Sequence, residues 1–333
     1  MHLGKAYRLG EFVIWTRRSI YALLALSLAP VLLYEYAGMT WLTLPLPVVS
    51  LLGTATTFVV GFKNVQTYAR TIEAQRIWMN IVSASRYWGI ISREYVDDDA
   101  RAETLLRRHL AWLTALRYQL REARPWESSD NRPNREYRKR YVIPERAVAL
   151  ETALSAHLSQ EEVTALRHAD SKAMQVLAMQ GRAVRELLDE EAITASEYAE
   201  FNSRIRDLLD QQGQAERLKN FPYPRQYAII NTLFVRAFCV VLPVGLMGQF
   251  AQMGQDMAGI LHDRMVWLAV PFSLIISWIY LSLEQVGEST ENPFEGSAND
   301  VPISRLSTMI ERDLKQMQGR VDLPGMSADV IVL

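Results

Sequence analysis

The sequence has little of the chemistry on which enzymes and metal sites depend. Cys239 is the only cysteine among 333 residues, which excludes an intrachain disulfide and a metal site built from several thiolates. Its place inside an apolar run predicts a small buried side chain. The Gly-rich phosphate loop, the His-Glu-x-x-His zinc motif and the Gly-x-Ser-x-Gly nucleophile motif are also missing. The sequence therefore predicts no enzymatic activity, no cofactor and no metal.

An excess of charge of either sign is missing too. The 36 basic and 37 acidic residues nearly cancel, so no nucleic-acid partner is expected. The five histidines are scattered, and His109, which lies beside an apolar stripe, is expected to pack in a core. A basic stretch at 121–141 is interpreted as a solvated loop between helices.

Long apolar runs, in contrast, are present. A helix needs about 20 apolar residues to cross a bilayer, and a soluble protein rarely holds uncharged runs of this length. Buried core helices are the alternative, and membrane spans are the preferred interpretation. The four predicted spans are Ser19–Tyr34 (extendable through Ala37), Thr40–Phe62, Ile229–Met253 and Met265–Leu283.

Basic residues show how these spans are oriented. They gather before the first span, after the second and before the third, whereas the turn between spans one and two has no Lys or Arg. Because basic residues stay on the cytoplasmic side, both termini are predicted to be cytoplasmic. Asp263, Arg264 and Glu284 mark the ends of span four. The predicted parts are a cytoplasmic N-terminal segment (1–18), spans one and two (19–62), a cytoplasmic helical domain (63–222), spans three and four (223–284) and a cytoplasmic loop, helix and tail (285–333).

The large insertion between spans two and three reads as helical throughout. Residues 102–120 place apolar side chains at three-to-four spacing, which is typical of an amphipathic helix. Pro144 is predicted to start a helix, where its missing N–H is no loss. Ser159 and Glu162 form the pattern of a reciprocal helix cap. A last amphipathic helix is predicted at 304–317, so the fold class is an all-α membrane protein.

Three separated stretches resemble one family. "FVVGFKNVQTYARTIEAQRIW" (58–78) carries an apolar run, Gly-Phe, a basic residue and Asn, then Tyr-Ala-Arg, an acidic residue and Trp. "FPYPRQYAIINTLFVRAFCVVLPVGL" (221–246) and "LEQVGESTENPFEGSANDVPI" (283–303) follow in order. All three are similar to bestrophins, and in particular to the bacterial bestrophin-like branch. The resemblance covers nearly the whole chain.

The resemblance implies a homopentameric ion channel in the bacterial inner membrane. Its partners would be four further copies of itself, membrane lipid and monovalent ions. The second helix of each copy would line a narrow neck, and alignment on Gly-Phe places the neck at Thr54, Phe58 and Phe62. Positions i, i+4 and i+8 share one face of a helix, and rings of apolar side chains can gate a pore by dewetting. The alternative is that Phe58 and Phe62 pack against spans one or three.

The resemblance also implies a second constriction, the aperture, in the cytoplasmic domain. Counting back without gaps from Pro224 places it at Ser196, flanked by Glu197 and Glu200. The alternative for Ser196 is a helix cap.

In animal members, calcium opens or stabilises the channel through an acidic loop after span four. Here that loop, which includes Asn292, Pro293, Phe294 and Asp300, has lost most of its acidic run. Because calcium takes six to eight oxygen ligands, no tight calcium site is expected. Asn292 and Asp300 are instead predicted to hold the turn of the loop and its packing on the neighbouring subunit.

Some charges near the predicted pore favour cations and others favour anions. Glu35 near the outer mouth, with Glu197 and Glu200 near the aperture, favours cations. Lys63 and Arg70 below the neck favour anions unless they pair with Glu73. The sequence thus favours monovalent cations slightly over chloride. A chloride channel of the same fold, a secondary transporter and a non-conducting membrane scaffold or sensor are the alternatives.

Overall fold

The computed structural model describes residues 9–128, 131, 134–135, 138–139, 141–255, 264–319 and 331, and the elements it forms there are helices. The predicted all-helical class is therefore confirmed for this part of the chain. Asp263, together with most of the predicted turn between spans three and four, lies outside the described residues.

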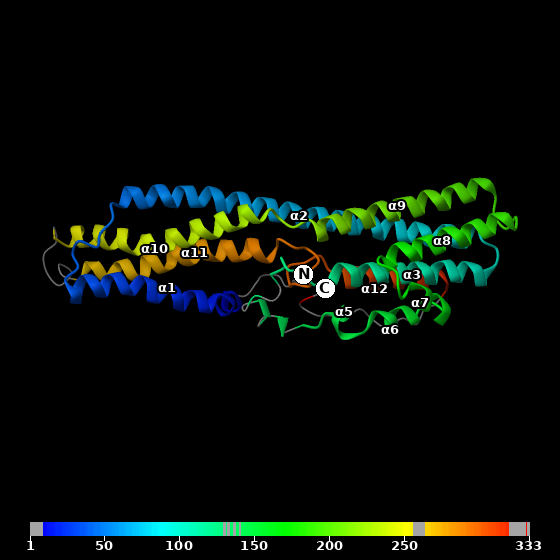
Figure 1. Cartoon of the computed structure of the whole chain (residues 1–333), viewed down its shortest axis with the longest axis horizontal. Coiled ribbons are helices and arrows are strands. Elements are labelled where there is room, and N and C mark those ends of the chain that lie inside the picture. Colours follow the sequence, from blue (N-terminus) through cyan, green and yellow to red (C-terminus); the bar gives the residue numbers. More distant parts are fainter. Residues whose placement is uncertain are drawn as a thin grey trace.

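One helix, α2 (Leu46–Glu94), runs through the molecule (Figure 1). It begins after Pro45 and has Pro47 in its first turn, where proline is tolerated. Its 49 residues correspond to about 73 Å of helix. The apolar and polar halves of the 58–78 stretch therefore belong to one uninterrupted helix.

Two helices pack against the first half of α2 (Figure 1), α10 (Arg225–Gln255) and α11 (Ala269–Ser289), the latter preceded by the short 3-10 helix η1 (Met265–Leu268). A third, α1 (Leu9–Ala37), packs on α11 and α10 on the side away from α2. With α2, these three helices are the four described helices long and apolar enough to cross a membrane, and each contains most of one predicted span.

The helix bounds differ from the predicted runs. α2 begins six residues after Thr40 and continues past Phe62 to Glu94, and α10 extends beyond Ile229–Met253 at both ends. α1 begins ten residues before Ser19 and α11 continues past Leu283 to Ser289, and Gly10 and Gly287 lie inside these extensions without ending either helix.

Small residues set the contact between α2 and α10. A Cβ atom on Gly53 would lie 2.8 Å from the ring of Phe238, and one on Gly245 would lie 2.7 Å from Val49. Glycine removes the side chain that would hold the two backbones apart, as is common where helices pack in lipid. α10 thereby covers one face of α2 and leaves the opposite face open.

The second half of α2 packs into a helical domain (Figure 1) formed by α3 (Asp99–Arg121), α8 (Lys172–Asp189), α9 (Ala195–Asn220) and α12 (Ile303–Met317), with the short helices α5 (Pro144–Ala147), α6 (Leu150–Ser155) and α7 (Gln160–Leu166). The largest hydrophobic core of the described chain lies here. The predicted stripe of α3, the predicted helix start at Pro144 and the predicted final helix are confirmed. So is the cap of α7, where Ser159 and Glu162 bond reciprocally.

His109 lies inside this core, as predicted. Its ring is 6.0 Å from that of Trp88 and 5.3 Å from that of Trp112, centroid to centroid. The side chain is 1% exposed and neither ring nitrogen has a hydrogen-bond partner. Burial disfavours the charged imidazolium and lowers the pKa of His109 to about 3. His109 is therefore a neutral packing residue.

Candidate functional site

The predicted neck residues lie on the open face of α2. Phe58 is 74% exposed and Phe62 is 69% exposed. Thr54 is also exposed, and its hydroxyl donates to the carbonyl oxygen of Ser50 at 3.0 Å. In this chain, therefore, neither phenylalanine packs against α1 or α10, and the alternative of buried phenylalanines is wrong.

The open face continues far beyond the neck. Exposed residues recur at three-to-four spacing over almost the whole of α2, while the buried residues of the helix follow the opposite face. We call this row of exposed residues the α2 stripe. It consists of Leu51, Thr54, Phe58, Phe62, Val65, Ala69, Ile72, Arg76, Asn80, Ser83, Tyr87 and Ile90.

A buried ion pair lies on α2 directly after Phe62. Lys63 Nζ is 3.7 Å from Glu291 Oε2, and the two side chains are 5% and 4% exposed. Arg225 Nη1 approaches the other carboxylate oxygen of Glu291 at 3.2 Å. Burial raises the pKa of Glu291, while Lys63 and Arg225 oppose that rise. Lys63 thus points away from the α2 stripe and is neutralised inside the chain.

Arg70 is also held inside the chain, by main-chain carbonyl groups. Its guanidinium donates to the carbonyl oxygens of Leu218 at 2.8 Å, Phe221 at 3.1 Å and Glu291 at 3.1 Å. Burial lowers the pKa of Arg70, although Glu291 and Glu73 oppose the shift. The carboxylate of Glu73 forms its ion pair with Arg217, so the considered pairing of Lys63 and Arg70 with Glu73 is replaced by Glu291 and the carbonyl groups.

The loop after α11 is folded into the chain around Asp300. This carboxylate accepts from the Gly296 N–H at 2.6 Å, the Ser297 hydroxyl at 2.6 Å and Arg121 Nη1 at 3.2 Å. Gly296 has φ +92, a conformation that favours glycine. The predicted role of Asp300 in holding the turn is confirmed, and its side-chain partners belong to the same chain.

The other predicted loop residues take part less directly. Phe294 is 1% exposed in the large core, and the Pro293 carbonyl accepts from Val301 N at 3.3 Å, which closes the loop. Asn292 holds the turn through its main chain, since its carbonyl accepts from Glu295 N at 3.4 Å. Its side-chain Nδ2 is buried without a hydrogen-bond partner.

The calcium ion of animal relatives does not fit this loop. Both oxygens of Asp300 accept hydrogen bonds, and a guanidinium cation lies against one of them. A calcium ion needs free oxygen ligands, not a neighbouring positive charge. Among the described residues no group of three or more His, Cys, Asp or Glu side chains is arranged to hold a metal.

Part of the basic 121–141 stretch is buried against this loop, which corrects its interpretation as a solvated loop. Ser128 donates to Glu295 from both its N–H and its hydroxyl, at 3.0 Å each. Glu127 pairs with Lys219, and both are nearly fully buried. Burial, with Asp300 and Glu127 nearby, raises the pKa of Glu295 well above its usual range. These long-range polar contacts bind the insertion to the end of α11.

The predicted aperture residues lie in the first turns of α9. Thr194 is the cap of this helix, and its hydroxyl and N–H bond reciprocally with Glu197. Ser196 is exposed in the first turn, so the alternative role of Ser196 as the cap is wrong. Glu200 Oε1 lies 3.3 Å from Arg204 Nε. Both predicted aperture carboxylates are therefore engaged within the chain.

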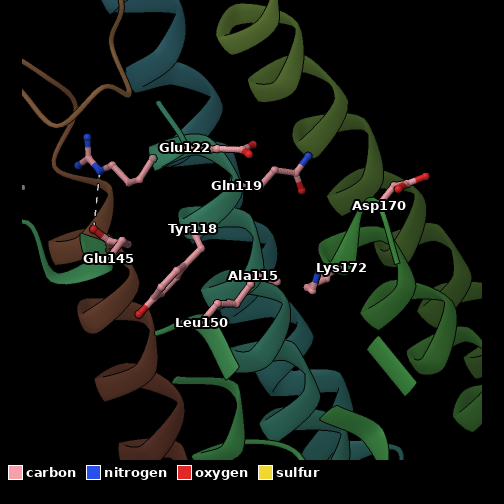
Figure 2. Close-up of a pocket in the computed structure, with 9 residues that line it drawn as sticks. Ala115, Tyr118, Gln119, Glu122, Glu145, Leu150, Asp170 and Lys172 are labelled. Carbon is pink, nitrogen blue, oxygen red and sulfur yellow. Dashed lines mark ion pairs between the residues drawn. The ribbon is translucent and has the colours of Figure 1, made fainter. Parts of the chain in front are cut away.

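A cavity of about 300 Å³ opens beside α3 (Figure 2). Sequence reasoning did not foresee it, because its walls come from separate segments. Its polar groups are largely bonded to the protein itself: Glu145 pairs with Arg117 at 2.8 Å, and Lys172 donates to the Ala169 carbonyl at 3.2 Å. The cavity therefore offers few free groups for a ligand. Its lining residues are Ala115, Tyr118, Gln119, Arg121, Glu122, Glu145, Leu150, Asp170 and Lys172.

Four apolar spanning helices joined to one helical domain define a multi-pass membrane protein. The family model described as "Bacterial/Fungal Bestrophin protein" matches residues 10–316. The chain belongs to the bestrophin family, as the three sequence motifs indicate.

Curated relatives agree with this membership. The chain is 26% identical over 300 residues to the "Voltage-dependent anion channel-forming protein YneE" of Salmonella typhi, covering 90% of this chain and 85% of that protein. It is 25% identical over 283 residues to the "Voltage-dependent anion channel-forming protein RSc3414" of Ralstonia nicotianae, covering 82% and 78%.

A solved structure shares the fold. A crystal structure of a bacterial bestrophin homolog from Klebsiella pneumoniae matches with a TM-score of 0.76 and 23% identity, over 92% of this chain and 99% of that one. At this level of identity the likeness shows the fold alone.

Proposed function

We propose that five copies of the chain form a channel in a bacterial inner membrane through which small monovalent ions move passively. Both termini and the 63–222 domain would lie in the cytoplasm. Thr54, Phe58 and Phe62 would form the neck, and Ser196, Glu197 and Glu200 would surround the cytoplasmic aperture. Membership of the bestrophin family and the channel-forming names of the relatives support this proposal.

The α2 stripe is the observation that carries it. Lipid alone could cover two exposed phenylalanines on a spanning helix, but the same face stays open through Arg76, Asn80 and Ser83, where the helix is polar. A face that carries two phenylalanines in the membrane half and Arg76, Asn80 and Ser83 in the domain half fits a continuous water-filled axis with a dry neck. Fivefold symmetry would bring five such stripes around one axis.

The ion is proposed to be an anion such as chloride. Two of the three acidic residues that favour cations are engaged within the chain, Glu197 in the cap of α9 and Glu200 with Arg204. The relatives are named as anion channel-forming proteins. A monovalent cation remains the second candidate, favoured by Glu35, which is exposed at the outer end of α1.

Ion flux from purified protein in liposomes tests the proposal. Chloride efflux that is faster than from empty liposomes, together with a native mass of five copies, is the expected result. Reversal potentials in NaCl and KCl gradients then give the sign of the permeant ion. Absence of flux of either sign would favour a non-conducting scaffold or sensor, and flux that saturates and depends on a coupled ion would favour a transporter.

A further inference from the structure

The α2 stripe carries one charged side chain, Arg76. We propose that five copies of Arg76 form a ring of positive charge that makes the pore favour anions. This inference rests on the channel function proposed above and assigns the selectivity to one residue.

The register of α2 places Arg76 on the same side of the helix as Phe58. It follows Phe58 by 18 residues, which is about five helical turns, or ~27 Å along the helix. Because five turns return to the same direction, the two side chains leave α2 on the same side. An ion that passes the neck would therefore meet Arg76 next on the domain side.

Arg76 is available to an ion because the protein does not use it. It is exposed, and within the described part of the chain no hydrogen bond or ion pair engages it. The neighbouring basic residues differ: Lys63 is buried against Glu291, and Arg86 Nη2 lies 2.7 Å from Asp313 Oδ2.

A solvated surface arginine is the common role for such a side chain. Fivefold assembly makes that role costly here, because five like charges would face one axis and repel one another. A counter-ion in the axis offsets this repulsion. Nearby acids are used elsewhere, because Glu73 pairs with Arg217, and Glu200 and Asp207 both pair with Arg204, at 3.3 and 2.8 Å. A permeating anion would supply the counter-charge for the five Arg76 side chains.

Reversal potentials of substituted channels test this. Arg76→Gln should lower the chloride-to-sodium permeability ratio about threefold to tenfold in low salt, and by less as salt rises, because screening acts over about 10 Å at 0.1 M. Arg76→Glu should shift the ratio further toward sodium, and Arg76→Lys should preserve it. Arg93→Gln is the matched control, since Arg93 is exposed on α2 but about 100° around the helix from Phe58.

Chemical modification separates selectivity from folding. Cys239 is the only cysteine and is 4% exposed, so an Arg76→Cys channel can be assembled first and labelled afterwards. A trimethylammonium methanethiosulfonate reagent should restore the chloride preference, and a sulfonate reagent should favour sodium. If the substituted channels conduct but their chloride-to-sodium permeability ratio does not change with the side chain at position 76, the proposed Arg76 ring is wrong. That result would not contradict the channel function. Absence of ion flux through the unsubstituted protein would instead contradict the channel function.

Discussion

Lys63 Nζ lies 3.7 Å from Glu291 Oε2, and this buried pair fastens the loop after α11 to α2 one residue below Phe62. Gly287 supports the same junction, because a Cβ atom there would lie 2.3 Å from Asn64 Oδ1. The point at which α2 changes from apolar to polar is thus the point at which a distant loop is attached to it.

Removing one partner of this pair should destabilise the protein. Glu291→Gln leaves the buried ammonium of Lys63 without its counter-charge, which costs about 3–5 kcal/mol when a buried pair loses one member. Thermal unfolding of detergent-purified protein measures the loss. The double variant Lys63→Met, Glu291→Gln should be more stable than Glu291→Gln alone. Equal stability of Glu291→Gln and the unsubstituted protein would show that the pair contributes nothing.

His109 should make the protein sensitive to acid. Its pKa is lowered from 6.5 to about 3 in the folded chain, so between these values the unfolded state binds more protons. Its contribution to stability is therefore complete above pH 6.5 and is lost as pH falls toward 3, by about 2 kcal/mol at pH 5. His109→Leu should be less sensitive over this range. Parallel stability curves for the two proteins from pH 5 to 7 would contradict the burial of a neutral imidazole.

Gly89 should not tolerate even one methyl group. A Cβ atom there would lie 2.3 Å from Leu314 Cδ2 and 3.2 Å from Met317 Sδ, so Gly89→Ala should displace α12 and cost about 1–3 kcal/mol. Gly213→Ala is the control, because nothing lies within 4 Å of that Cβ position. It should gain up to about 1 kcal/mol from helix propensity. A Gly89→Ala protein as stable as Gly213→Ala would exclude the close α2–α12 contact.

Periodicity made the helices predictable. The four apolar runs and the stripe of α3 are read directly from the spacing of residues in the chain. The cap of α9 was also readable, since Thr194 and Glu197 have the same spacing as Ser159 and Glu162. Ser196, where the gapless count from Pro224 places the aperture, lies two residues after this cap.

The polar interior could not be predicted in the same way. Asp300 meets Arg121 across 179 residues, and Arg70 meets carbonyl groups 148 and more residues away. No local spacing signals a contact between distant segments, and a carbonyl acceptor has no side chain to mark it. The composition of the 121–141 stretch therefore predicts a solvated loop, whereas Glu127 and Ser128 are buried against distant segments.

The conductance of neck variants tests the central claim, that the α2 stripe lines an ion pore, most directly. Phe58→Ala and Phe62→Ala are compared with Phe272→Ala, which removes an exposed phenylalanine from α11 instead. Replacing the bulky phenylalanine side chains by alanine widens the constriction and lets water enter it. Both α2 variants should therefore conduct more than the unsubstituted channel, and Phe272→Ala should not. Unchanged conductance in both α2 variants would contradict the pore along α2.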